Sequence, residues 1–184
     1  MNFHIISIFP ESFESYINAS IIKRARDFGL IKINIKNPRF YTNDKHNTMD
    51  DNPYGGGVGM VLKAEPIIKA ADEIISKTKE KTKVMILSPN GSQFDNKKAK
   101  FLAKKYKNII LICGKYEGID ERVKKALKAE EVSVGPYILS GGELPSLIII
   151  DAVSRQIEGV LGKKNLWKNQ GRCAITRFTQ DLKN

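Results

Sequence analysis

Short apolar runs alternate along this chain with longer segments in which apolar residues recur every three or four positions. Residues 3–8 form the first apolar run, which predicts a buried strand. The segment 11–28 follows, and its four-residue spacing of apolar side chains predicts a single helix: Phe13, Ile17, Ile21 and Ala25. Gly29 can end that helix, because glycine readily adopts the left-handed conformation found after helices. Isoleucines at 31, 33 and 35 alternate with polar residues and predict a half-exposed strand.

The middle of the chain begins with a long polar segment, residues 37–59. Its length predicts an ordered or mobile loop with a function of its own. Helical spacing returns over 64–75, and the run VMILS at 84–88 predicts a buried strand. The sequence SPNG, which begins at Ser88, predicts a turn that stops this strand, since proline and glycine interrupt regular structure. A further helix is expected over 95–107.

The last predicted elements follow the same alternation. The run NIILIC at 108–113 predicts a strand, residues 119–128 a short helix, 130–134 a strand, and 143–157 a final helix. Strands without polar interruptions are typical of parallel sheets that crossover helices cover on both faces. The pattern therefore predicts an α/β fold with a mostly parallel sheet flanked by helices.

Length and composition favour one globular domain followed by a tail. The 184 residues are enough for one sizeable core. No basic region precedes the apolar N-terminal residues, and no run approaches the ~20 apolar residues that span a bilayer, which disfavours secretion and membrane insertion. Cys113 and Cys173 form neither a disulfide framework nor a zinc cluster, so a reducing cytoplasm is expected.

The charge balance favours a polyanionic partner. Lysine and arginine number 31 against 20 acidic residues, a net charge of +11. Nucleic acid is the leading candidate, through Coulomb attraction and counterion release, although a solvated basic surface is the alternative. The helix at 95–107 concentrates lysines on its exposed face, and such a face is more often solvated than bound. Residues 163–184 hold six basic residues and one acid, so the tail carries +5.

Three glycine-containing turns follow three of the apolar strands, at 88–91, 113–118 and 135–142. In open α/β sheets, ligands bind at the carboxyl ends of the strands, so these turns are expected to converge on one pocket. None fits the glycine patterns that hold dinucleotides or nucleotide triphosphates, which favours a ligand without phosphate. The alternatives are that glycine here only permits turns, and that Glu117, between two of the glycines, is a simple surface charge.

Six ordered motifs resemble the bacterial tRNA (guanine-N1)-methyltransferases: FPESF, DDNPYGGGVGM, SPNG, CGKYEGIDERV, VGPYILSGGELP and DAVSRQIEGVLG. The resemblance runs from Met1 to about Gly162. It implies an S-adenosylmethionine-dependent methyltransferase of the SPOUT type, with a C-terminal trefoil knot, that acts as a homodimer with its active site at the subunit interface. We expect a knotted domain at 1–162. The tail, 163–184, does not match the family's linker, and we expect the helical domain that grips tRNA in the family to be absent.

The resemblance also implies which residues bind the methyl donor, S-adenosylmethionine. They lie in the three glycine turns: Leu87, Ser88, Pro89, Gly91, Gly114, Tyr116, Glu117, Gly118, Val134, Gly135, Pro136, Tyr137, Ile138, Leu139, Gly141, Gly142 and Pro145. Backbone and apolar contacts suit a neutral adenine and a sulfonium. At position 136 the family usually has aspartate, so the proline here removes a carboxylate and a backbone N–H.

Methylation at guanine N1 requires loss of the N1 proton and leaves negative charge shared with O6, which calls for a general base and a nearby cation. The resemblance implies that Arg155 is the cation, Glu117 helps to organise the site, and Mg²⁺ takes part. From sequence alone, Arg155 would instead pair with Asp151 one helical turn earlier. The family's base is a linker aspartate, and Asp181 is the only acid of the tail. We therefore expect methyl-donor binding with impaired methyl transfer.

The polar loop resembles the family's tRNA-facing segment, which implies tRNA contacts at Asp44, His46, Asp50, Tyr54, Gly55, Gly56 and Gly59. A glycine-rich backbone can approach phosphates or an unstacked base. The function implied is methylation of N1 of the guanosine just 3′ of the tRNA anticodon. The alternatives are a non-catalytic dimer that binds S-adenosylmethionine and RNA, and a related knotted methyltransferase that acts on another RNA.

Overall fold

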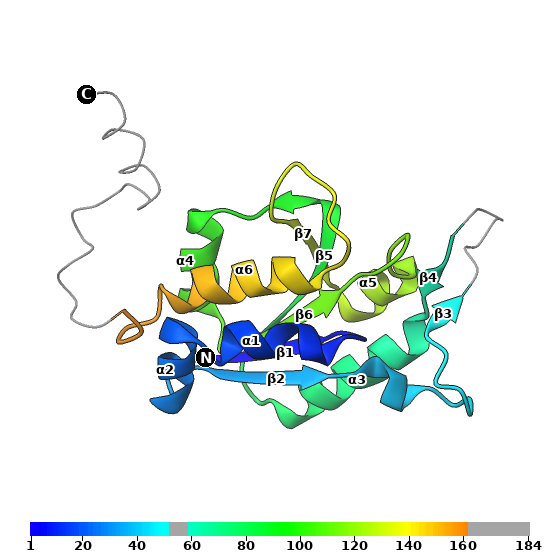
Figure 1. Ribbon diagram of the computed structural model, residues 1–184, viewed down its shortest axis with the longest axis horizontal. Helices are drawn as coiled ribbons and strands as arrows, with labels where there is room; N and C mark the ends of the chain where they lie inside the picture. Colours follow the sequence, from blue (N-terminus) through cyan, green and yellow to red (C-terminus); the bar gives the residue numbers. More distant parts are fainter. Residues whose placement is uncertain (52–58, 162–184) are drawn as a thin grey trace.

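The computed structural model describes residues 1–51 and 59–161, and its centre is a parallel sheet of five strands (Figure 1). The strand order is β2-β1-β6-β5-β7. Their bounds are β1 Asn2–Ile6, β2 Lys32–Lys36, β5 Thr82–Gln93, β6 Asn108–Cys113 and β7 Glu130–Ser133. All six residues of β6 are buried, as expected for an apolar strand at the centre of the sheet, whereas β2 lies at an edge and is half-exposed. The predicted α/β fold with a mostly parallel sheet is confirmed.

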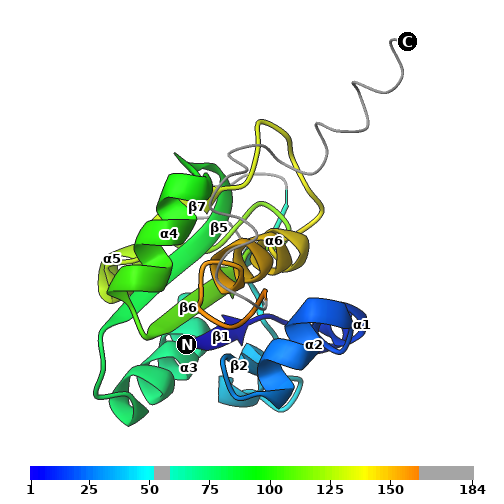
Figure 2. The same ribbon diagram turned by 90° about the vertical axis from the view of Figure 1, so that its left-hand side faces the viewer.

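Helices cover both faces of this sheet, as Figure 2 shows. One face packs against α2 Ser20–Asp27, α4 Asn96–Lys105 and α6 Glu143–Ser154, and the other against α3 Ala64–Lys77 and α5 Glu121–Leu127. Alternate residues of β6 enter the two cores, Ile109 and Leu111 on the first face and Ile110 and Ile112 on the second. A strand buried on both sides therefore requires the unbroken apolar run seen in the sequence.

The single helix predicted for residues 11–28 is wrong, because the structure divides this segment into three pieces. A 3-10 turn, η1 Pro10–Phe13, leads into α1 Glu14–Ile17, and α2 begins at Ser20. Ser20, the first residue after the break, has a φ of 47°, a conformation outside the helical range. After the break the buried position is Ile22 rather than Ile21, so the helix face has turned. Gly29, at a φ of 67°, ends α2 as predicted, and its N–H donates to Arg26 O.

The turn predicted at SPNG is also corrected. Strand β5 continues to Gln93, but Leu87 and Ser92 both stand opposite Val132, so residues 88–91 form a bulge in the pairing with β7. Gly91 is necessary at this place, because a Cβ there would lie 2.3 Å from the backbone nitrogen of Val132. The proline and glycine signal thus marks an interruption of regular pairing within the strand, not the end of the strand.

The polar segment after β2 forms short regular elements in its described part, residues 37–51 and 59. It contains η2 Pro38–Tyr41 and β3 Asp50–Asp51, and β3 pairs antiparallel with β4 Val61–Leu62. Tyr41 and Lys36 both contact Glu73 of α3, Tyr41 by a hydrogen bond and Lys36 by a salt bridge of 3.1 Å. The start of this loop is therefore held against α3.

Within the residues that the structure describes, every helix is too short or too polar to cross a membrane. The tail at 163–184 lies outside the described residues, so its predicted separation from the domain stays a prediction. The trefoil knot likewise remains an implication of the resemblance.

Candidate functional site

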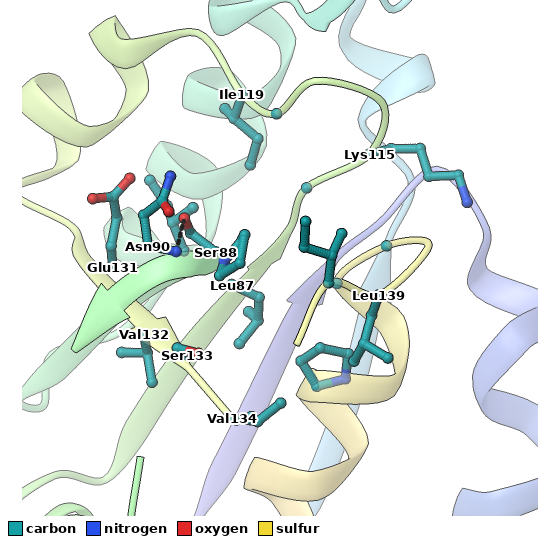
Figure 3. A pocket seen from close by; sticks show the side chains of 18 of the residues that line it. Leu87, Ser88, Asn90, Lys115, Ile119, Glu131, Val132, Ser133, Val134 and Leu139 are labelled. Atoms are coloured by element: carbon teal, nitrogen blue, oxygen red, sulfur yellow. Dashed lines mark hydrogen bonds between the residues drawn. The ribbon is translucent and has the colours of Figure 1, made fainter. Parts of the chain in front are cut away.

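A cavity of about 370 Å³ lies over the carboxyl ends of β5, β6 and β7. The three glycine-containing loops that were predicted to converge line it together (Figure 3). Fifteen of the predicted methyl-donor residues lie on its wall: Leu87, Ser88, Pro89, Gly114, Tyr116, Glu117, Gly118, Val134, Gly135, Tyr137, Ile138, Leu139, Gly141, Gly142 and Pro145.

Two residues predicted to bind the methyl donor lie away from the cavity wall. Gly91 packs beneath β7, where it permits the close approach of the Val132 backbone, and Pro136 is exposed at the outer side of its loop. Gly91 therefore shapes the strand pairing behind the cavity. Pro136 lacks the backbone N–H that another residue would have, but this position does not line the cavity.

The second loop, residues 114–118, turns sharply between β6 and α5. Tyr116 has a φ of 56° and Gly118 a φ of 129°, and the N–H of Gly118 donates to Lys115 O at 3.0 Å. Positive φ is costly for tyrosine, so the surrounding hydrogen bonds must hold this conformation. The Lys115 side chain extends away from Leu87 and Ile119, and its Nζ lies 5.3 Å from the centroid of the Phe9 ring (Figure 3).

The third loop is tied directly to the second. The N–H of Gly142 donates to Gly114 O at 2.9 Å. A Cβ at position 142 would lie 2.6 Å from the Cα of Cys113, so only glycine lets the two backbones meet this closely. At the other end of the loop the Tyr137 ring lies against Gly135, where a Cβ would be 2.3 Å from a ring carbon. The two glycine positions of this motif thus serve two different contacts.

Charged side chains occupy one part of the cavity wall. Lys124 Nζ lies 2.8 Å from Glu131 Oε2, and this hydrogen bond raises the pKa of Lys124. Arg122 holds Asp120 by a pair of contacts of 2.6 and 3.0 Å, and its hydrogen bonds lower the Asp120 pKa. The remainder of the wall combines apolar side chains, backbone groups and further polar side chains such as Asn90 and Ser133. Such a wall suits a ligand that combines a flat apolar ring with polar edges.

Sequence reasoning missed other residues of the wall. Asn90, Lys115, Ile119, Glu131, Val132 and Ser133 also line the cavity. Lys115 and Asn90 lie inside recognised motifs, so they could have been predicted from the neighbouring residues of those motifs. Glu131 and Val132 gave no signal, since they belong to a strand whose place beside β5 depends on long-range pairing.

Among the described residues, the loop expected to face tRNA touches the cavity wall through Gly59, whereas Asp44 lines a separate pocket beside α3. Asp44 and His46 are exposed, and Asp50 lies in β3 with its Oδ1 buried and without a hydrogen-bond partner among the described atoms. Gly59 has a φ of 114° and packs against Glu117, with a Cβ position only 2.5 Å from Glu117 Cγ. The predicted contacts at Tyr54, Gly55 and Gly56 lie outside the described residues.

A short backbone ladder connects this loop to the second cavity loop. Glu117 N donates to Met60 O at 3.1 Å, Leu62 N donates to Gly118 O at 3.1 Å, and Asp120 N donates to Leu62 O at 3.2 Å. The two segments, 60–62 and 117–120, were recognised as separate motifs. The fold makes them immediate neighbours.

Arg155 does not reach the cavity of its own chain. It is the exposed residue directly after α6, whereas Gly142, at the cavity, directly precedes that helix. The 12 residues of α6 separate the two by about 18 Å at 1.5 Å per residue. Asp151, the alternative partner expected for Arg155, accepts a hydrogen bond of 2.7 Å from the Tyr16 hydroxyl.

Neither the general base nor a metal site can be assigned in the described part of the chain. Asp181 lies outside it. Among residues 1–51 and 59–161, no group of three or more acidic, histidine or cysteine side chains is arranged to hold a metal ion. Mg²⁺ therefore remains an expectation from the resemblance.

A parallel α/β sheet with a glycine-walled cavity over its carboxyl edge is typical of proteins that bind a small organic ligand. The family model described as tRNA (Guanine-1)-methyltransferase TrmD matches residues 1–173. The chain belongs to this family.

Curated relatives agree with the family match. A protein of Dictyoglomus turgidum is 52% identical over 158 residues, which cover 86% of this chain and 62% of the relative. A protein of Carboxydothermus hydrogenoformans is 49% identical over 88% of this chain and 62% of its own length, and one of Thermomicrobium roseum is 43% identical over 98% and 67%. All three are named tRNA (guanine-N(1)-)-methyltransferase. The chain spans somewhat less than two thirds of the length of the first of these relatives.

Proposed function

We propose that this chain forms the methyl-donor-binding part of an enzyme that transfers a methyl group from S-adenosylmethionine to N1 of the guanosine just 3′ of the tRNA anticodon. The observation that carries this proposal is the convergence of three glycine loops on one cavity, joined by the Gly142 to Gly114 hydrogen bond, in a member of this family. The reaction would take place in the cytoplasm.

The cavity fits S-adenosylmethionine in size and in chemistry. Its volume of about 370 Å³ lies within the ~300–1,000 Å³ typical of small-molecule pockets. Leu87, Ile119, Val134 and Leu139 would enclose the adenine, while backbone groups of the glycine loops would hold its polar edge. When bound, the cofactor supplies an electrophilic methyl group on a positively charged sulfur. Glu117 places negative charge on the wall that would receive this cation, whereas the charge of Glu131 is opposed by Lys124.

Arg155 would act from a second copy of the chain. Its own cavity is about 18 Å away along α6, too far for its side chain to reach a guanine there. The outer side of α6 exposes Leu144 and Ile148, at 55% and 37%, and the adjacent loop exposes Ile138 at 86%. These apolar side chains support a self-complementary interface in which Arg155 of one copy stabilises charge on O6 of a guanine bound to the other.

Proton removal from N1 needs a general base. Asp181 is the candidate of the tail, and Mg²⁺ the candidate cofactor for this step. Both belong to the proposal. The consequence is that binding of the methyl donor and methyl transfer are separate properties, which are best measured separately.

Two assays test this function. Isothermal titration calorimetry with S-adenosylhomocysteine should show binding, and absence of binding would remove the cavity assignment. Methyl transfer is then measured on tRNA that carries the target guanosine and on tRNA with adenosine at that position. Binding without transfer would favour the non-catalytic S-adenosylmethionine- and RNA-binding protein, and transfer to a different RNA would favour the related methyltransferase.

If methyl transfer is observed, subunit mixing tests the role of Arg155. Arg155→Ala alone and Gly142→Ala alone should each lose most activity, the first through the missing cation and the second because the added Cβ pushes the two cavity loops apart. A mixture of the two variants contains heterodimers in which one cavity is intact and faces an intact Arg155. Recovered activity in the mixture supports the shared site, whereas no recovery with confirmed heterodimers would contradict it.

A further inference from the structure

A group of cations surrounds two aromatic rings at the amino ends of the central strands, far from the cavity. We define it as the basic aromatic patch: Lys81, Phe101, Lys104, Lys105, Tyr106 and Lys107. It is formed by the last turn of α4, the residues that lead into β6, and the residue before β5. In Figure 1, β1 and β2 start on the side marked N and point away from it, so the amino ends of the sheet lie on that side.

The geometry of the patch brings positive charges onto the rings. Phe101 and Tyr106 meet edge to face, with centroids 6.1 Å apart. Lys105 Nζ lies 4.6 Å from the Phe101 centroid and 5.8 Å from that of Tyr106, and Lys81 Nζ lies 5.7 Å from the Tyr106 centroid. Phe101 is nevertheless 49% exposed. An apolar ring with a lysine ammonium over it is thus presented to solvent.

Backbone hydrogen bonds hold further positively charged residues side by side at the amino ends of the strands. Lys107 N donates to Lys81 O at 3.2 Å, and Asn2 N donates to Lys107 O at 2.8 Å. The N-terminal ammonium lies beside them. Burial is the main cause that lowers its pKa, and the charge of Lys107 lowers it further, while the charge of Glu80 raises it. In the described residues, Lys104, Lys105 and Lys107 form no salt bridge.

Helix electrostatics explains only part of this arrangement. Lys104 and Lys105 in the last turn of α4 interact favourably with the negative end of the helix dipole. That effect does not require an exposed phenylalanine, nor does it place Lys81 and Lys107 beside the same rings. A polyanion would relieve the mutual repulsion of these lysines, and an exposed aromatic ring offers a stacking surface for a base.

We infer that the basic aromatic patch is a second RNA-binding surface, in which the lysines contact phosphates and an unstacked base lies against Phe101. RNA fits better than an acidic protein, because it supplies regularly spaced phosphates and flat bases together. The inference rests on the proposed function in that it takes tRNA as the RNA. It adds an RNA contact at the amino ends of the strands, whereas the reacting base would lie at their carboxyl ends.

The distance between the two sites sets the kind of RNA required. The six residues of β6 run from the patch to the cavity loops, about 20 Å at 3.3 Å per residue. An RNA bound at both places must therefore extend at least that far from its target base. A full tRNA meets this requirement, whereas an isolated loop of a few nucleotides does not.

The test measures the affinity of the full chain for a tRNA transcript and for a short anticodon-loop oligonucleotide over a series of salt concentrations. Lys104→Ala/Lys105→Ala should weaken tRNA binding about tenfold and reduce the salt slope by about 1.4 to 1.8 for two lost phosphate contacts. Phe101→Ala should weaken it about 5-fold or more, as expected for one lost stacked base. Affinity for the short oligonucleotide and for S-adenosylhomocysteine should not change.

Lys23→Ala/Lys125→Ala is the matched control, since it removes the same two charges from exposed lysines of α2 and α5. Thermal unfolding of each variant checks that the fold is kept. The inference is overturned if the patch variants bind tRNA with the affinity and salt slope of the wild type, or if the control weakens binding equally. The same series with tRNA that carries adenosine at the target position separates the two proposals: continued methyl transfer to this tRNA with an unchanged patch effect would refute the guanosine specificity alone.

Discussion

Ser7 Oγ donates a hydrogen bond of 2.7 Å to Glu143 Oε1, which joins the end of β1 to the first turn of α6. Ser7 is almost fully buried and also accepts a hydrogen bond from Phe9 N. The second carboxylate oxygen of Glu143 lies only 2.4 Å from where a Cβ on Gly141 would be. The glutamate therefore supports the Gly141–Gly142 wall of the cavity from behind.

Glu143→Ala should destabilise the protein by about 1–3 kcal/mol, because the buried Ser7 hydroxyl loses its acceptor. Glu143→Gln keeps an oxygen at that position and should lose less. Urea unfolding measures the difference, and calorimetry with S-adenosylhomocysteine measures whether the wall has moved. Equal stability of the alanine variant and the wild type would show that this hydrogen bond contributes nothing.

Gly91→Ala should reduce the free energy of unfolding by about 1–3 kcal/mol or more, because the added methyl group meets the backbone of β7 and no flexible side chain can yield. Gly114→Ala is the control, since its Cβ meets nothing closer than Leu87 O at 3.4 Å. Both variants are compared by thermal and urea unfolding. A smaller loss at Gly91 than at Gly114 would contradict the close packing of β5 against β7.

Cys113 should resist thiol reagents in the folded protein. Burial raises the pKa of its thiol far above the usual range, and the negative charge of Glu143 raises it further, so the reactive thiolate is absent at pH 8. The measurement uses Ellman's reagent on a Cys173→Ser background, which leaves one thiol to count. We expect no reaction under native conditions and one thiol per chain in guanidinium chloride. Rapid native labelling would contradict the buried position.

Glu130 should stabilise the protein at neutral pH but not in strong acid. Burial raises the pKa of its carboxyl, but hydrogen bonds from Lys83 and Lys98 outweigh this and lower the pKa to about 2. A carboxyl with a lowered folded-state pKa contributes fully above its ordinary value of 4.5, and that contribution is lost as pH falls toward 2. Glu130→Gln should therefore be less stable than the wild type at pH 7, with a gap that closes toward pH 2. Glu11→Gln, at an exposed site, serves as the control; a gap that widens in acid would reverse the assigned direction.

The sequence patterns predicted the elements whose environment is uniform along their length. The fully buried β6 and the amphipathic α3 follow directly from their apolar spacing. The break before Ser20 could not be predicted from apolar spacing. Ile21 and Ile22 are both apolar, so the sequence does not show that the buried position shifts by one residue, to Ile22, after the break. The bulge at 88–91 likewise depends on the pairing of β5 with β7, two strands separated along the chain by α4, β6 and α5.

The residues of the candidate site likewise divide into those that the sequence could predict and those that it could not. Its glycine loops were recognisable because close backbone approach leaves a residue-type signature at Gly135 and Gly142. Glu131 and Ser133 reach the cavity only through the position of their strand in the sheet, and single-sequence patterns carry no information about that position. The separation of Arg155 from the cavity follows from the straight path of α6.

We expect the ladder between residues 60–62 and 117–120 to link the two sides of the site thermodynamically. A ligand that fixes the backbone at Glu117 also restricts the segment after Gly59, so part of the ordering entropy of that segment is already lost when a second ligand arrives. Linkage is reciprocal, and each ligand must then raise the affinity for the other by the same factor. Three backbone hydrogen bonds thus give the protein a means of cooperative binding without any large movement of domains.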